Sequence, residues 1–287
     1  MSRLICLILL LLQPLLSGLN ASAQEPLRVV ASIKPLQLLA AAITDGVSSP
    51  ALVIGAGQDP HHPALRPSER RTLAQAGMTL WVGPPLEAAL ADVIDTEAEN
   101  VITAYTLLEN SGLTFTERVD PHVWLSTGNA RLLAQVLARR LQRFDSANRV
   151  AYANNLNRFL LALDTLDQEI AAQFAGLDTD NFAVYHNAFA YFEKQFGLQH
   201  QVSFTENEEI QPGVRRILQI QEIIAANEIS CLLIEPGNNP VQLAQLLDRP
   251  LQMTSIDVLG FAYPLSATAY VDFMRNLSVS IAECIGQ

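Results

Sequence analysis

The chain has 287 residues, of which 49% are hydrophobic and 16% are charged, and its formal net charge at pH 7 is -11. This excess of negative charge argues against nucleic acid or an anionic membrane surface as a partner. The length is enough for two modest domains.

The first 23 residues predict a cleaved signal peptide that is not part of the fold. Arg3 supplies a short positive region, residues 4–16 are apolar and rich in leucine, and residues 21–23 form a small-residue cleavage site. The apolar run is shorter than the roughly 20 residues that span a bilayer. Cys6 lies at the start of this run and is poorly placed for lipidation. We therefore expect a soluble exported protein.

Two cysteines, Cys231 and Cys284, remain after removal of the signal peptide. An exported chain with two cysteines favours one disulfide, and a pair of buried thiols is the alternative.

The mature chain alternates strand-like and helix-like segments in two series. In the first half we predict strands at 27–31, 51–54, 78–82 and 101–104, and helices at 36–43, 69–76, 86–94 and 129–144, with a polar irregular segment at 109–120. In the second half we predict strands at 182–185, 201–204, 229–234 and 252–256, followed by helices ending at 196, 226, 247 and 284.

Between the two series, residues 147–174 keep a helical pattern without glycine or proline. We interpret this segment as a linker helix between two domains. The sequence thus predicts an α/β protein with two lobes, each with a mainly parallel four-stranded sheet, joined by a long rigid linker helix. The expected divisions are an N-terminal metal-binding lobe at 24–145, the linker at 146–177 and a C-terminal metal-binding lobe at 178–287.

A loop rich in glycine and proline, 57–68, follows the second predicted strand and holds two of the five histidines. Prolines on both sides of this pair fix the backbone, so an imidazole here is presented with little entropy left to lose. His61 and three other polar residues follow predicted strands: His122, His186 and Asp257.

In open α/β sheets the ligand crevice lies beyond the carboxyl ends of the strands. Two facing lobes would bring these four side chains together, and three imidazoles with one carboxylate suit Zn²⁺. The alternative is that each histidine makes a structural hydrogen bond and that Asp257 is a turn or cap residue.

The remaining polar residues near these positions are less informative. Asp59 and Asp120 each stand two residues before a candidate histidine in an Asp-Pro-His run, where they either orient the imidazole or form a turn. His62 is expected to point away from His61. His200 is interpreted as a surface residue, and Glu235 follows a strand without an identifiable partner.

At these residues the chain resembles a known family, the periplasmic zinc-binding proteins of ABC importers. The matching stretches, in the same order and spacing as in the family, are 57–61, 65–68, 81–84, 120–125, His186 with 191–197, 209–213, 235–236 and 257–260.

The resemblance implies two (β/α) lobes with the metal held between them by His61, His122 and His186. Asp257 falls on the family's carboxylate position, which is a direct ligand in some members and is replaced by water or another carboxylate in others. Cys231 and Cys284 match a disulfide near the C-terminus. One departure is that 109–120 is short and has no histidine, whereas many zinc-type members carry a long histidine-rich insertion.

By this resemblance we expect a periplasmic receptor, not an enzyme, that captures Zn²⁺ and delivers it as a monomer to an inner-membrane ABC permease with its cytoplasmic ATPase. A manganese or iron receptor is the first alternative, although manganese-binding relatives usually carry Glu where His186 stands. A zinc hydrolase and a soluble zinc buffer are the others. The hydrolase is disfavoured because the ligands lack an adjacent Glu base of the His-Glu-x-x-His type.

Overall fold

The computed structural model describes residues 26–115, 119–205 and 212–286. The predicted signal peptide, 1–23, lies outside these ranges, as does most of the 209–213 stretch. Among the described residues, no helix combines the length and the apolar character needed to cross a membrane.

The first lobe is built around a parallel sheet with strand order β2-β1-β3-β4. Its elements are β1 (Val29–Ala31), α1 (Lys34–Thr44), β2 (Ala51–Leu52), α2 (Pro67–Ala74), β3 (Met78–Trp81), α3 (Pro84–Glu87), η1 (Ala88–Leu90), β4 (Val101–Thr103), α4 (Ala104–Asn110), η2 (Val123–Leu125) and α5 (Thr127–Phe144).

The second lobe repeats this plan with strand order β6-β5-β7-β8. After η3 (Ser146–Asn148) and α6 (Arg149–Phe174), its elements are β5 (Phe182–His186), α7 (Ala190–Phe196), β6 (Val202–Thr205), α8 (Val214–Ala226), β7 (Cys231–Ile234), α9 (Pro240–Gln245), β8 (Gln252–Ser255) and α10 (Ala269–Ile285). The central strands of both sheets are buried along their whole length, as expected where helices cover both faces.

Two predictions, one of a helix and one of an irregular segment, need correction. The predicted helix at 86–94 begins earlier, because prolines occupy the first turn of α3, and it ends in the short 3-10 turn η1. The segment after β4 begins with α4, although irregular structure was predicted from 109. Ala104, Tyr105 and Leu108 share the buried side of α4, and this one-turn spacing is too short to stand out in the sequence.

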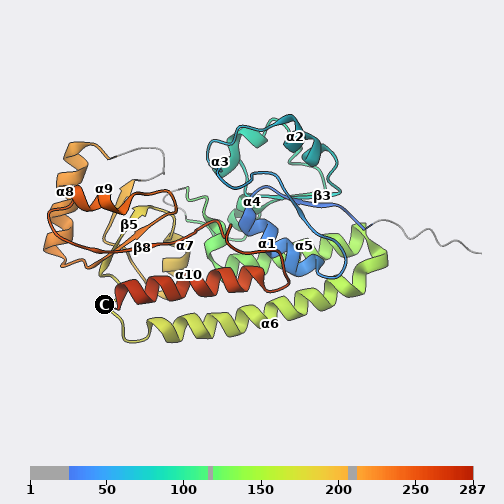
Figure 1. The fold of residues 1–287 in the computed structure, drawn as a ribbon. Helices are drawn as coiled ribbons and strands as arrows, with labels where there is room; N and C mark the ends of the chain where they lie inside the picture. Colours follow the sequence, from blue (N-terminus) through green and yellow to red (C-terminus); the bar gives the residue numbers. More distant parts are fainter. Residues whose placement is uncertain (1–25, 116–118, 206–211, 287) are drawn as a thin grey trace, which may run out of the picture.

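The long helix predicted between the two lobes is present as α6. Its buried residues recur every three or four positions, including Tyr152, Phe159, Leu163, Leu166 and Ile170, so one stripe of the helix faces the core. Figure 1 shows α6 running beneath both lobes with α10 beside it. These two helices form a common base for the molecule.

The core is continuous between the lobes. One cluster of buried side chains joins β1 and β3 of the first lobe, α6 and α10, and one face of β5 and β7. A separate cluster fills the other face of the second sheet beneath α8. A disulfide between Cys231 and Cys284 ties β7 to α10, which confirms the predicted pair.

Candidate metal centre

The structure brings together the three histidines predicted from the strand ends. Each of His61, His122 and His186 offers a ligand nitrogen, and these nitrogens all lie within 4.8 Å of one another. The ring centroids are 5.4 Å apart for His61 and His122, 5.8 Å for His61 and His186, and 4.8 Å for His122 and His186. Residues far apart in the sequence thus form one compact imidazole cluster.

His186 is the last residue of β5, and the sheet register explains its partner. Val184 pairs with Leu233 of the parallel strand β7, so the residue two positions further along each strand is also adjacent. Glu235 therefore lies beside His186, and its Oε1 is 2.8 Å from His186 Nδ1. Both side chains are buried. Such a carboxylate fixes the orientation and tautomer of a ligating imidazole.

His122 has an equivalent carboxylate from its own turn. Asp120 Oδ1 accepts the backbone N–H of His122 at 3.0 Å and lies 2.8 Å from its Nδ1. His122 and Asp120 are each only 3% exposed. The Ser126 hydroxyl then accepts the Asn129 N–H and caps α5. The His122 ring is thus held at Nδ1 by a carboxylate from two residues earlier.

His61 lies in the connection between β2 and α2 and is partly exposed. Asp59 Oδ1 accepts the backbone N–H of His61 at 2.8 Å, while its Oδ2 is 3.3 Å from Nδ1 of His62. The His62 side chain is 60% exposed. Asp59 therefore stabilises the loop by accepting the backbone N–H of His61, and its second carboxylate oxygen faces the ring of His62.

The fourth predicted ligand, Asp257, follows β8. Its carboxylate accepts the backbone N–H groups of Leu259, Gly260 and Ala262 at 2.8–3.1 Å. It is not a member of the described cluster whose ligand atoms lie within 4.8 Å of one another. It lines an adjoining cavity of about 490 Å³, together with residues 56–60 and Glu235. Burial lowers the pKa of Lys34, and the negative charge of Asp257 partly offsets that effect.

Sequence reasoning missed the role of Glu235 in this arrangement. The missing information was the strand order, since only the pairing of β5 with β7 places Glu235 beside His186. His200, interpreted as a surface residue, is mostly buried, and its Nδ1 lies 2.6 Å from Glu193 Oε1. This pair joins the middle of α7 to the loop before β6, and neither residue belongs to the imidazole cluster.

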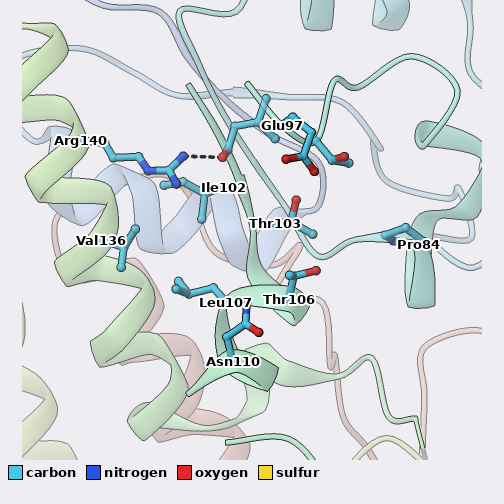
Figure 2. Close-up of a pocket in the computed structure, with 11 residues that line it drawn as sticks. Pro84, Glu97, Ile102, Thr103, Thr106, Leu107, Asn110, Val136 and Arg140 are labelled. Carbon is cyan, nitrogen blue, oxygen red and sulfur yellow. Dashed lines mark hydrogen bonds between the residues drawn. The ribbon is translucent and has the colours of Figure 1, made fainter. Parts of the chain in front are cut away.

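A second cavity of about 380 Å³ lies at the outer edge of the first sheet. Arg140 of α5 donates to the carbonyl of Val101, and Figure 2 shows its side chain in the cavity with Thr103, Thr106 and Asn110 on the surrounding wall. The guanidinium also donates to the Glu99 carbonyl at 2.8 Å. These bonds cover outward-facing carbonyls at the edge strand β4, which protects the edge from pairing with another chain.

Several curated proteins are similar to this chain in sequence. Among curated proteins, the high-affinity zinc uptake system protein ZnuA of Yersinia pestis is 31% identical over 90% of this chain and 91% of the relative. The protein of the same name from Haemophilus ducreyi is 29% identical over 90% and 93%, and that from Brucella suis biovar 1 is 28% identical over 93% and 94%.

Solved structures with similar folds include a crystal structure of ZnuA, with a TM-score of 0.74 and 21% identity over 89% of this chain and 99% of that one. The laminin-binding adhesin of Streptococcus agalactiae gives a TM-score of 0.76 at 20% identity over 90% and 99%. The model of the family described as the periplasmic component A of the zinc-uptake complex matches residues 29–284. The chain therefore belongs to this zinc-uptake component A family.

Proposed function

We propose that this protein captures Zn²⁺ at His61, His122 and His186 in the periplasm and delivers it to an ABC permease for zinc uptake. The observation that carries the proposal is the cluster of three imidazole nitrogens within 4.8 Å, built from both lobes. The protein's family and its curated relatives support the transport role.

The chemistry of the ligands favours zinc. Imidazole nitrogen suits borderline-soft ions such as Zn²⁺, whereas manganese sites rely more on carboxylates. The carboxylates of Asp120 and Glu235 lie at Nδ1 of His122 and His186, which supports our proposal that Nε2 of each ring binds the metal. Both rings therefore present an oriented nitrogen to the ion.

Three imidazoles leave one tetrahedral position to fill. The two candidates from the sequence are Asp257 and water. Because three backbone N–H groups hold the Asp257 carboxylate in the cavity wall, we assign it to the wall beside the metal and assign water to the fourth position. Asp257 then contributes negative charge to the cleft without a direct bond to the ion.

The proposed transport route consists of export of the protein and transfer of the zinc ion to a permease. The predicted signal peptide exports the chain, and the mature protein works as a monomeric carrier without a catalytic step. The inner-membrane permease, with its cytoplasmic ATPase, accepts the ion from the cleft. Growth of a gene-deletion strain under zinc chelation tests delivery, since a protein that only buffers zinc would leave uptake through the permease intact.

The binding site is tested by competitive zinc titration of the mature protein beside the His61→Ala, His122→Ala, His186→Ala triple variant. We expect one tightly bound zinc in the native protein and none in the variant. His62→Gln is the matched control, since this exposed histidine adjoins the cluster, and it should bind zinc as the native chain does. Far-ultraviolet circular dichroism verifies that the triple variant is folded.

Two outcomes contradict the proposal. Tight zinc binding that survives in a folded triple variant means that other residues hold the ion. Preference for manganese over zinc in direct competition preserves the transport role and overturns the zinc assignment.

A further inference from the structure

One carboxylate on the long helix α6 connects helices of both lobes. Asp167 Oδ1 accepts a hydrogen bond from the Thr127 hydroxyl of α5 and another from Gln195 Nε2 of α7 at 3.2 Å. Its Oδ2 lies 3.4 Å from Arg131 Nη2, also of α5. Helix α6 packs against both α5 and α7. We call Asp167, Thr127, Arg131 and Gln195 the helix junction, because these residues join the first lobe, the second lobe and the helix between them.

The carboxamide of Gln195 completes the helix junction at the beginning of α5. Its Oε1 accepts the Ser126 hydroxyl at 2.7 Å and the Gly128 backbone N–H at 3.3 Å, and its Nε2 also donates to the Thr127 hydroxyl. The Gly128 amide belongs to the first turn of α5, where backbone N–H groups have no partner within the helix. One side chain of the second lobe therefore bonds the N-terminal turn of a first-lobe helix while its amide nitrogen faces Asp167.

The helix junction lies at the boundary between core and solvent. Thr127 is fully buried, and the side chain of Asp167 is 32% exposed. Polar contacts in such a partly desolvated place are stronger than those of fully exposed pairs. Burial raises the pKa of Tyr270, and the negative charge of Asp167 raises it further. Because Tyr270 Oη donates to the Trp124 carbonyl at 2.7 Å, Asp167 is electrostatically coupled to a residue that holds the segment before α5.

Two of the three clustered histidines are close in sequence to the helices that the helix junction connects. His122 precedes Ser126, the N-cap of α5, by four residues, and His186 precedes Ala190, the first residue of α7, by four residues. The two rings have centroids 4.8 Å apart, and both offer ligand atoms to the imidazole cluster. A shift of α5 relative to α7 would therefore change the distance between these two imidazoles.

From these contacts we infer that Asp167 is a positioning residue of the metal centre, which sets the spacing of His122 and His186 by fixing α5 to α7. This inference rests on the proposed zinc function, and it assigns the linker helix a part in holding two of the ligands at metal-binding distance. Ligands that are in place before the ion arrives lose little conformational entropy on binding. The helix junction should therefore slow the release of zinc.

Variants of two neighbouring aspartates separate this role from a general effect of charge. Asp167→Ala removes the acceptor for Thr127 and Gln195. Asp164→Ala is the matched control, since Asp164 lies three residues earlier on α6, is 57% exposed and pairs with the same Arg131 at 2.8 Å. Each variant removes one negative charge from α6 and one ion pair with this arginine.

Zinc release is measured by stopped-flow mixing of each zinc-loaded protein with excess chelator. We expect release to be about threefold to tenfold faster from Asp167→Ala than from the native protein, and within about twofold of the native rate in Asp164→Ala. Equal release from Asp167→Ala and the native protein would overturn the inference. An equally large effect in Asp164→Ala would also overturn it, since charge alone would then account for the change.

A reversal of the hydrogen-bonding pattern tests the contact itself. Gln195→Glu places a second carboxylate against Asp167, and because like charges repel, zinc should leave about tenfold faster than from the native protein. Adding Asp167→Asn supplies an amide donor toward that carboxylate and keeps an oxygen for Arg131. We expect the double variant to release zinc within about threefold of the native rate. A double variant as fast as Gln195→Glu alone would contradict the inference.

Melting temperatures and NMR spectra of the metal-free proteins separate positioning from stabilisation. If Asp167→Ala melts earlier but releases zinc at the native rate, the helix junction only stabilises the fold and the inference is wrong. The imidazole signals of His122 and His186 should shift in metal-free Asp167→Ala and stay in place in Asp164→Ala; unchanged signals in both would contradict the positioning role. This comparison needs no zinc, whereas failure of the native protein to bind zinc at the three histidines would contradict the proposed function.

Discussion

The chain contains the run Asp-Pro-His twice, and the two copies differ in which imidazole ring the aspartate contacts. In both, Oδ1 accepts the backbone N–H of the histidine two residues later, at 2.8 Å for Asp59 and 3.0 Å for Asp120. Asp120 also lies at Nδ1 of its own histidine, whereas Asp59 lies at Nδ1 of His62.

Packing, not local sequence, separates these two outcomes. The common backbone bond is the turn that Asp favours before proline. Asp120 is buried under Tyr191, which bonds its carbonyl, so its carboxylate and the His122 ring are confined together. Asp59 is partly exposed beside an exposed His62. The same three residues thus orient the imidazole of His122 in one copy, whereas in the other copy the aspartate bonds only the backbone N–H of His61 among the contacts described above.

Glu87 and Asp120 are both buried carboxyl groups, but Asp120 lies at Nδ1 of His122 whereas Glu87 lies away from the imidazole cluster. Glu87 is fully buried, and desolvation raises its pKa to about 7, although the hydrogen bond from the Gly83 N–H at 3.0 Å lowers it in part. Between about pH 4.5 and 7 the unfolded chain ionises this group while the folded chain keeps it protonated. The free energy of unfolding should therefore fall over this range by roughly 2–4 kcal/mol and level off above it.

Glu87→Gln mimics the protonated side chain and should remove this contribution. Urea denaturation at pH 5 and pH 8 measures it: the variant should be more stable than the native protein at pH 8 and similar at pH 5. An identical difference between the two pH values in both proteins would contradict the assignment.

The two aspartates can be compared directly by mutation. Asp120→Ala removes the carboxylate that orients His122 and should weaken zinc binding about 10-fold to 100-fold, measured by competition with a chelator. Asp59→Ala is the matched variant and should cost at most about fivefold, as for an exposed pair. Equal losses would mean that burial does not distinguish the two runs.

Glu235 extends the comparison to the second lobe. Glu235→Gln keeps an oxygen that accepts from His186 Nδ1 and removes the negative charge, so we expect a loss of zinc affinity near the lower limit for such groups, about tenfold. The same titration measures it. A loss as large as that of His186→Ala would place Glu235 on the metal itself.

The smallest effect is expected from making the two runs identical. The residue after His122 is Val123 and the residue after His61 is His62, so His62→Val extends the match between the copies to four residues. If burial decides the outcome, zinc affinity should change less than about threefold. A gain of tenfold or more would show instead that His62 draws Asp59 away from the ring of His61.

The sequence predicted the two parallel sheets, the long helix between them and the convergence of the three histidines, because strand ends of parallel sheets meet at one edge. It did not predict the partner of Glu235, since strand order is a property of the sheet and not of any one strand. The different roles of Asp59 and Asp120 and the hydrogen bonds that join residues 120–124 to the second half of the chain also depend on distant residues. Tyr191, Val258 and Tyr270 carry no local signal of that contact.

The most direct test of the zinc centre is X-ray absorption spectroscopy of the zinc-loaded mature protein at the zinc edge. The structure predicts three imidazole nitrogens at about 2.0–2.1 Å and one further light-atom ligand. If water fills the fourth position, as we propose, the Asp257→Asn variant should give the same spectrum. A shell with fewer than three imidazoles would contradict the assignment of His61, His122 and His186 as the zinc ligands.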